Sequence, residues 1–318
     1  ELSCAVLDEA HYIKNPEARR SQAAAQVIAD AKYVIMMTGT PLENRVSEFS
    51  NLVDYIRPDL ASTAPEYLPS KFRKHVAPAY LRRNQEDVLT ELPDLIEVDD
   101  WMQLSRSDAA EYREAVEAGH FMRMRRAAML NPDSTKFGRL LEIVEEAEAN
   151  NRRVIVFSYF RDVLAQVAAA LPGQVFGPLT GSVPAAQRQR LVDDFTAAPG
   201  GAALVSQITA GGVGLNIQSA SVVVICEPQL KPTLEAQAIA RAHRMGQTQI
   251  VQVHRLLTED SVDERIREIL TKKRELFDSF ARDSVIANRA PDAVDISDAE
   301  LAREVIAAER ERLFGVER

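Results

Sequence analysis

The stretch Ser206–Gln247 reads SQITAGGVGLNIQSASVVVICEPQLKPTLEAQAIARAHRMGQ and carries the densest structural signal in the chain. The apolar run Ala202–Val205 predicts a strand that leads into the glycine-rich turn Ala210–Gly214, and a second apolar strand, Val222–Cys226, follows it. A helix is expected to begin after Pro232. Strands and helices that alternate in this way are typical of α/β proteins.

Three polar side chains of the expected helix are spaced to share one face. Gln237, Arg241 and Arg244 stand at positions i, i+4 and i+7. Two guanidiniums and an amide beside a turn that contains Gly212 and Gly214 suit a polyphosphate whose negative charge rises during reaction. Taken singly, the glycine turn could merely reverse the chain, and the arginines could form a solvated helix face.

Two carboxylates follow the first apolar run of the chain. Leu2–Leu7 predicts a buried strand, and Asp8 and Glu9 come directly after it, at the strand end where open α/β sheets place ligands. Asp8 can hold Mg²⁺, usually through water, and Glu9 can orient or deprotonate an attacking water. The alternative is an ordinary helix start, with an N-cap aspartate and an acid in the first turn.

A βα rhythm runs through most of the chain and predicts parallel sheets with helices on both faces. We expect strands at 2–7, 33–37, 96–104, 154–157, 175–179, 202–205, 222–226 and 251–257. We expect helices at 16–29, 46–56, 108–130, 136–150, 163–171, 185–195, after residue 232, at 262–280 and from a Ser297/Glu300 capping box to about 313.

Composition limits the class of protein. A chain of 318 residues with 46% hydrophobic residues allows two domains of ordinary size. The formal charge of −9 excludes a protein coated in basic surface, but a local basic groove can still act alone, since salt screens charges beyond ~8–10 Å. No apolar run reaches the ~20 residues that span a bilayer, so no membrane partner is expected.

The two cysteines indicate a reducing compartment. Cys4 and Cys226 both lie in apolar runs, so we expect buried, reduced thiols and neither a disulfide nor a metal site. This favours a cytoplasmic protein, associated with the nucleoid if the source is bacterial. The chain begins with Glu1 beside a predicted strand, from which we expect a piece of a longer protein.

Several segments together resemble motifs of Swi/Snf-type ATP-dependent DNA translocases, which are superfamily 2 helicases with a DEAH box. The segments are DEAHYIKNPEARRSQAA at 8–24, TGTPLENR at 38–45, RRNQEDVLTELP at 82–93, STKFGRLLEI at 134–143, SYF at 158–160, the glycine turn at 210–214 and AHRMGQ at 242–247. The AHRMGQ ending argues against the alternative of a DEAH-type RNA helicase.

The resemblance implies two RecA-like lobes with parallel sheets flanked by helices, the first lobe incomplete. The implied divisions are residues 1–95 for the first lobe, 96–150 for a mostly helical connector, 151–280 for the second lobe and 281–318 for a helical extension. ATP and Mg²⁺ would lie between the lobes. Asp8 would hold the metal and His11 the nucleotide, Glu9 would activate water, and Arg241 and Arg244 would reach the γ-phosphate, with Gln237 beside them.

The resemblance also implies a grip on duplex DNA through its phosphates, without sequence preference, and a protein target that is remodelled. The residues implied for this grip are Thr38, Thr40, Ser158, Arg161, Thr180, Gly181 and Gln207. Arg123, Arg125 and Arg126 could also touch a DNA backbone, although a solvated basic face is the simpler interpretation.

Two departures from the family pattern stand out. The sequence contains no GxxxxGK[ST] loop, whose amides and lysine hold the β- and γ-phosphates, so we expect this chain alone to be inactive. The family's DPWWNP-like segment is here Glu227–Pro232, reading EPQLKP, without tryptophan. A binding module that keeps the fold and only docks onto nucleic acid or a partner therefore remains an alternative.

Overall fold

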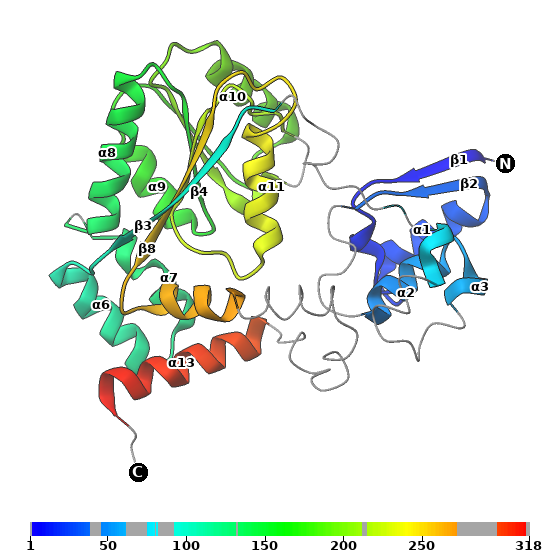
Figure 1. Ribbon diagram of the computed structural model, residues 1–318, viewed down its shortest axis with the longest axis horizontal. Helices are drawn as coiled ribbons and strands as arrows, with labels where there is room; N and C mark the ends of the chain where they lie inside the picture. The colour runs from blue at the N-terminus through cyan, green and yellow to red at the C-terminus, as the bar shows by residue number, and fades with distance from the viewer. Residues whose placement is uncertain are drawn as a thin grey trace. The chain divides into compact units, whose positions relative to one another are not determined.

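The chain forms two compact units in a computed structural model, which describes residues 2–38, 46–61, 75–79, 81, 92–131, 133–211, 215–271 and 298–315. Unit 1 contains Glu1–Asn84 with Thr271–Ser297, and unit 2 contains Gln85–Leu270 with Asp298–Arg318. Both units are α/β, as the sequence predicts (Figure 1).

Unit 1 contains a small parallel sheet. Strands β1 (Leu2–Leu7) and β2 (Ala31–Met36) pair from Leu2 opposite Ala31 to Leu7 opposite Met36. The other elements described in this unit are the 3-10 turns η1 (Ala10–Ile13) and η2 (Ala77–Ala79) and the helices α1 (Arg19–Ala29), α2 (Val46–Asp54) and α3 (Pro58–Ala61). A short core gathers residues from these elements, namely Ala10, Ile13, Ile28, Leu52, Val53, Ala61 and Val76.

One face of this sheet packs on the core and the other is exposed. Successive side chains of a strand point to opposite faces. Leu7 and Val34 pack against the core, while on the other face Val6 is 57% exposed and Tyr33 62% exposed. The prediction of a buried first strand is therefore wrong for this chain, and so is the prediction of a buried Cys4, which is exposed.

Unit 2 is built on a six-stranded sheet with the order β3-β8-β7-β4-β6-β5, in which every pair is parallel. The strands are β3 (Leu95–Met102), β4 (Val154–Ser158), β5 (Val175–Leu179), β6 (Ala203–Gln207), β7 (Val222–Ile225) and β8 (Val251–Thr258). Every residue of β4 and β7 is buried, as in a parallel sheet that is covered on both faces.

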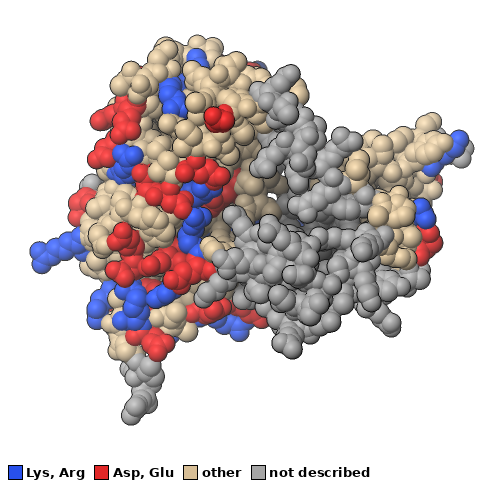
Figure 2. Space-filling model, viewed as in Figure 1, with Lys and Arg blue, Asp and Glu red and all other residues tan. Residues whose placement is uncertain are grey.

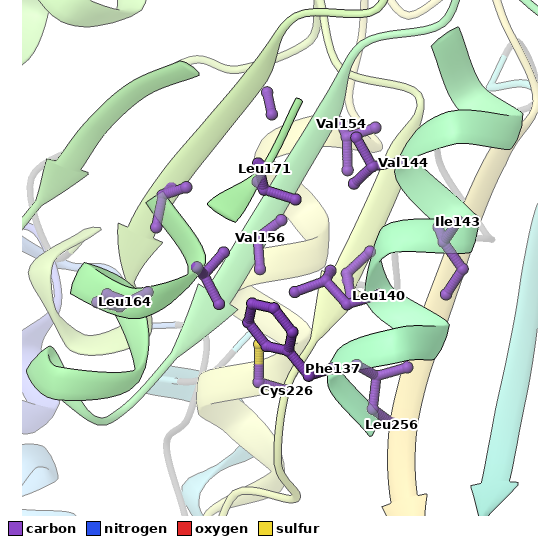
Figure 3. Packing of buried hydrophobic residues seen from close by; sticks show 14 of the residues in the cluster. Phe137, Leu140, Ile143, Val144, Val154, Val156, Leu164, Leu171, Cys226 and Leu256 are labelled. Atoms are coloured by element: carbon purple, nitrogen blue, oxygen red, sulfur yellow. The ribbon is translucent and has the colours of Figure 1, made fainter. Parts of the chain in front are cut away.

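Helices cover both faces of this sheet (Figure 1). They are α8 (Thr135–Ala149), α9 (Arg161–Ala170), α10 (Ala185–Ala197) and α11 (Pro232–Ala242), and residues 262–271 are also helical. Side chains of α8 and α9 share one core with Val154 and Val156, whereas those of α10 and α11 share another with Ile155 and Phe157. Figure 3 shows the first core, in which Phe137 and Leu140 of α8 lie near Val156 and Cys226.

The segment expected as a connector belongs to unit 2, and two of its elements build the sheet and its core. Strand β3 pairs with β8 along its whole length, from Leu95 opposite Val251 to Met102 opposite Thr258. Helix α8 fills one of the two cores. The connector also holds α6 (Arg106–Glu117), α7 (Phe121–Arg126) and the 3-10 turn η3 (Ala127–Met129).

The single helix expected at 108–130 is divided near Gly119, because another helix packs there. Gly119 has φ +68°, and a Cβ on it would lie 2.9 Å from Nη2 of Arg310. Arg310 belongs to α13 (Asp298–Phe314), and its guanidinium donates to the carbonyls of Val116 and Glu117 at the end of α6. This contact caps the helix with a cation and explains why the chain turns at a glycine.

A buried ion pair joins two further elements of unit 2. The ammonium of Lys136 on α8 binds the carboxylate of Asp263 and donates to the carbonyl of Cys226 at 3.3 Å. The side chain of Lys136 is fully buried and that of Asp263 is 3% exposed. None of the helices in the described ranges is long and apolar enough to cross a membrane.

The exposure of the two thiols gives a first prediction. Native chain should react with a thiol reagent once per molecule, at Cys4, and denatured chain twice. Cys226 is fully buried, and burial raises the pKa of its thiol well above its ordinary value, so the reactive thiolate is scarce. Mass spectrometry of the labelled protein, with Cys4→Ser as the control, measures this; rapid native labelling of Cys226 would contradict the packing of β7.

The Lys136–Asp263 pair gives a second prediction. Lys136→Met should lower the free energy of unfolding of unit 2 by about 3–5 kcal/mol, because it leaves a buried carboxylate without its cation. Urea unfolding followed by the fluorescence of Trp101 measures this, since the chain has one tryptophan and it lies in β3. Glu142→Ala removes the mostly exposed ion-pair partner of Arg139 on the same helix and should lower the free energy of unfolding by under about 1 kcal/mol. Equal losses in the free energy of unfolding for the two variants would show that the buried pair stabilises unit 2 no more than the exposed one.

Candidate functional site

The carboxyl ends of β1 and β2 bring the acidic motif and the first threonine of the next motif together. The imidazole Nδ1 of His11 lies 3.2 Å from the hydroxyl of Thr38 and 3.2 Å from the Oε2 of Glu9. The backbone fixes this arrangement, because the amide of Ala10 donates to the carbonyl of Met37 at 2.9 Å. The sequence predicted roles for these residues separately, and the structure places them in one cluster.

The two acids of this cluster differ in their setting. Glu9 has φ 50°, in the left-handed region that residues with a side chain seldom adopt, and such strain is concentrated at functional sites. Asp8 is exposed and accepts a hydrogen bond from the amide of Glu9 at 2.9 Å. No group of three or more metal-binding side chains occurs among the described residues. Asp8 fits the binding mode of Mg²⁺, which takes one or two carboxylates and completes its shell with water and phosphate oxygens.

In unit 2, the candidate nucleic-acid contacts lie where β4, β5 and β6 end. Arg161 is exposed and donates to the hydroxyl of Ser182 at 3.1 Å, and that hydroxyl lies 2.8 Å from the hydroxyl of Thr180. Gln207 donates to the carbonyl of Tyr159 at 3.0 Å. A Cβ on Gly181 would meet nothing within 4 Å, so the backbone here is open to a ligand. Four of the predicted positions therefore share one edge of the sheet.

Ser158 occupies a different place from the one that a nucleic-acid contact requires. Its side chain is fully buried, and its hydroxyl donates to Glu227 at 2.8 Å and accepts from the amide of Phe160 at 3.0 Å. In this structure Ser158 thus shapes the turn that follows β4 and presents no atom to solvent. Thr40, the remaining predicted contact, lies outside the described residues.

Sequence reasoning missed Arg188 on α10. Its guanidinium donates to the carbonyls of Val183, Gly181 and Ala210, at 2.6, 3.3 and 3.3 Å. These bonds tie the turn after β5 to the 3-10 turn η4 (Ile208–Gly211), which enters the glycine-rich segment. No sequence pattern indicates this role, because the bonds go to backbone carbonyls, one of them 22 residues away.

The three side chains predicted to share one face of α11 do not all do so. The helix ends at Ala242, so Gln237 and Arg241 stand one turn apart on it, whereas Arg244 lies beyond its end and is exposed. Arg241 is half-buried, burial lowers the pKa of its guanidinium, and its Nη1 has no hydrogen-bond partner among the described residues. Arg241 is therefore the more preorganised of the two cations for an incoming anion. Gly212 and Gly214 lie outside the described residues.

Gln247 explains why the helix ends before Arg244. Its buried side-chain amide donates to the carbonyls of Gln218, Ala220 and Ala242, and its oxygen accepts from the amides of residues 248 and 249. The preceding Gly246 has φ +95°, and a Cβ there would lie 2.8 Å from the side chain of Gln218. The last two residues of AHRMGQ thus fold the chain after α11 and set the position of Arg244.

The three arginines of α7 are committed to intramolecular contacts. Arg123 pairs with Glu114, Arg126 pairs with Asp162, and Arg125 is 3% exposed. Their interpretation as a solvated basic face is therefore incomplete, because one of them is buried. Figure 2 shows acidic and basic residues interspersed on the visible face of unit 2, with no continuous basic area.

Comparison with known proteins identifies the family. Residues 1–153 match the SNF2-related domain, and residues 135–246 match the helicase conserved C-terminal domain. The chain belongs to the SNF2-related helicases. This confirms the resemblance drawn from the motifs.

Individual relatives are distant and longer. An uncharacterized ATP-dependent helicase of Mycoplasma genitalium is 28% identical over 309 residues, which cover 85% of this chain and 30% of that protein. A chromodomain-helicase-DNA-binding protein 3 homolog of Caenorhabditis elegans is 27% identical over 325 residues, covering 84% and 18%. The C-terminal part of the Fun30 ATPase domain shares the fold, with a TM-score of 0.56 at 18% identity over 70% of this chain and 99% of that one. The chain thus spans under a third of the length of these two relatives.

The role of Gln247 gives a third prediction. Gln247→Ala should lower the free energy of unfolding of unit 2 by about 2–3 kcal/mol, because it leaves buried carbonyls and amides without partners. Urea unfolding monitored at Trp101 measures this. The control is Gln249→Ala, which removes an exposed side chain and should change stability by under about 0.5 kcal/mol. If both variants unfold at the same urea concentration, Gln247 does not fix the end of α11.

Proposed function

We propose that this chain is part of a motor that hydrolyses ATP, moves along duplex DNA and remodels protein–DNA complexes. The observation that carries the proposal is the cluster of Glu9, His11 and Thr38 at the end of β1 and β2. The same chain has polar groups at the ends of β4, β5 and β6 in unit 2, and the helix α11 with Arg241. Membership of the SNF2-related helicases supports it. The two relatives described above are named as an ATP-dependent helicase and a DNA-binding helicase, respectively.

Each residue of the cluster has a part in hydrolysis under this proposal. Asp8 would hold Mg²⁺, which when bound would supply positive charge to the phosphates. Glu9 orients the attacking water and accepts its proton, and the imidazole Nδ1 of His11 lies 3.2 Å from its carboxylate. Arg241 and Arg244 of unit 2 are assigned to the γ-phosphate under this proposal. Arginines used in this way are worth ~10³–10⁵ in rate in phosphoryl transfer.

The DNA contacts are assigned to the edge of unit 2 that is open to solvent. Arg161, Gly181 and Gln207 offer a guanidinium, bare backbone and an amide, which suit phosphate oxygens and read no base. With Thr38 and Thr40 of unit 1, they would follow a duplex without sequence preference. Opening and closing of the lobes with each ATP would then advance the protein along DNA.

The exposed face of the β1–β2 sheet bears on the activity of this chain alone. Parallel sheets are stable with both faces covered, and two strands are few for an independent sheet. The sequence also contains no GxxxxGK[ST] loop. We therefore propose that this chain alone does not hydrolyse ATP, and that residues outside it supply the phosphate-binding loop and cover this face. The second candidate, a binding module without catalysis, is favoured by the same missing loop.

Hydrolysis tests the proposed function. The chain of 318 residues should show no ATP hydrolysis, whereas the full-length protein that contains it should hydrolyse ATP faster with duplex DNA than with single-stranded RNA. In that protein, Arg241→Ala and Arg244→Ala should each lower turnover by about 10³–10⁵ with little change in ATP binding, since their charge acts in the transition state. The matched control is Arg190→Ala, an exposed arginine of α10. A full-length protein that is inert with DNA present contradicts the motor and leaves the binding module.

Labelling of Cys4 separates the two candidates without an activity assay. Cys4 lies on the open face of the β1–β2 sheet and pairs in register with Tyr33. In the full-length protein its reaction with a thiol reagent should slow by more than about tenfold relative to the short chain, because added strands or helices cover it. Equal labelling rates would mean that nothing outside this chain covers the face.

A further inference from the structure

A buried carboxylate of unit 2 links the turn after β4 to the segment that leads into α11. Glu227 directly follows Cys226 at the end of β7, and it is 1% exposed. Its Oε2 accepts from the hydroxyl of Ser158 at 2.8 Å, and its Oε1 accepts from the amide of Tyr159 at 2.6 Å. The turn after β4, which carries Tyr159 to the surface, is thus held by a residue from another strand.

Gln229 extends this network to α11. Its side-chain amide donates to the Oε1 and to the carbonyl of Glu227, both at 2.9 Å. Its backbone amide donates to the carboxylate of Glu235 at 3.0 Å, and Glu235 stands in the first turn of α11. Arg255 of β8 holds the other oxygen of Glu235 at 2.8 Å. A continuous path of hydrogen bonds therefore runs from Tyr159 through Glu227 and Gln229 to the helix that carries Arg241.

Arg125 closes the network from α7. Its guanidinium donates to the carbonyl of Pro228 at 2.8 Å and lies over the rings of Tyr159 and Phe160, at 5.6 and 5.4 Å from their centroids. Burial raises the pKa of Glu227 and lowers that of Arg125, and each charge counters the effect of burial on the other. Removal of either partner would leave the other charge buried, which makes the pair costly to break.

The two ends of the path face different ligands under the proposed function. Tyr159 is 37% exposed, and its carbonyl accepts from Gln207 at the edge assigned to DNA. The other end is the first turn of α11, whose later residues Gln237 and Arg241 are assigned to the nucleotide. We propose that Glu227 and Gln229 are positioning residues that couple the DNA-facing turn after β4 to the arginine helix. This inference rests on the function proposed above.

Gln229 is the better residue to vary, because it is neutral and its loss leaves the Glu227–Arg125 pair intact. In the full-length protein, Gln229→Ala should lower the DNA-stimulated rate about tenfold, the effect of about 1.4 kcal/mol on the barrier. Its rate without DNA and its KM for ATP should change less than about twofold, because the residue touches neither the phosphates nor Arg241. The stability control is Val167→Ala, which deletes core atoms of α9 away from the path.

Hydrogen exchange tests the path itself without any need for activity. In the 318-residue chain, Gln229→Ala should speed the exchange of the Tyr159 amide about tenfold relative to the unchanged chain, because its acceptor Glu227 loses a support. Val167→Ala should not speed the exchange of the Tyr159 amide more than that of other amides. Unchanged exchange at Tyr159 overturns the inference, even where hydrolysis in the full-length protein is stimulated by DNA. Loss of DNA stimulation in the unaltered full-length protein would instead overturn the proposed function.

A double variant decides whether the two residues act along one path. Glu227→Ala combined with Gln229→Ala should lower the DNA-stimulated rate no further than the more damaging single variant, since residues in one network are not additive. Independent contributions would multiply the two losses, and that result would overturn the coupling. Gln189→Ala, which removes an exposed hydrogen bond to Asp193 on α10, should leave all these rates unchanged.

Discussion

Parallel strand pairing is the constraint from which the arrangement of both candidate sites follows. Every strand pair in the described residues is parallel, so the carboxyl ends of the strands gather at one edge of each sheet. Ser158, Thr180, Gln207 and Glu227 each end or follow a different strand, and the fold brings them to one side although 69 residues separate the first from the last. Open α/β sheets bind their ligands outside the carboxyl ends of the strands, so the candidate residues of unit 2 lie where a ligand is expected.

The same pairing explains which charges had to be buried. A parallel sheet is covered by helices on both faces, so a polar side chain at its edge is soon surrounded by protein. Unit 2 contains the buried ion pair of Lys136 with Asp263, and the buried charges of Arg125 and Glu227 each counter the effect of burial on the pKa of the other. Such pairs add little stability over apolar residues of similar size, because desolvation offsets their attraction. Their value in this fold lies in direction, since Lys136 of α8 and Arg125 of α7 donate to the carbonyls of Cys226 and Pro228, which follow β7.

Many regular elements were predictable from sequence, whereas features set by contacts distant along the chain were not. The strand at 175–179 has the predicted bounds, and α8 differs from its prediction by one residue at each end, because apolar periodicity reports burial directly. The prediction that α11 extends to Arg244 was wrong. The side chain of Gln247 holds the following chain in another direction, through hydrogen bonds to carbonyls that are distant along the sequence. The prediction that Cys4 is buried was wrong for a different reason. Periodicity shows that a face of a strand is apolar, but it does not show whether this chain covers that face. Arg188 was missed because its partners are backbone atoms, which have no sequence signature.

The EPQLKP segment shows how a motif can change its residues and keep a place in the fold. The family pattern has tryptophans where this chain has Gln229 and Leu230, and the sequence alone left the role of the loop open. In the structure Gln229 is 1% exposed and uses its backbone amide and its side-chain amide in three hydrogen bonds, to Glu227 and Glu235. Hydrogen bonds are directional, so these three fix the orientation of the loop relative to Glu227 and to the first turn of α11. A polar segment therefore occupies this position through hydrogen bonds that aromatic side chains there could not make.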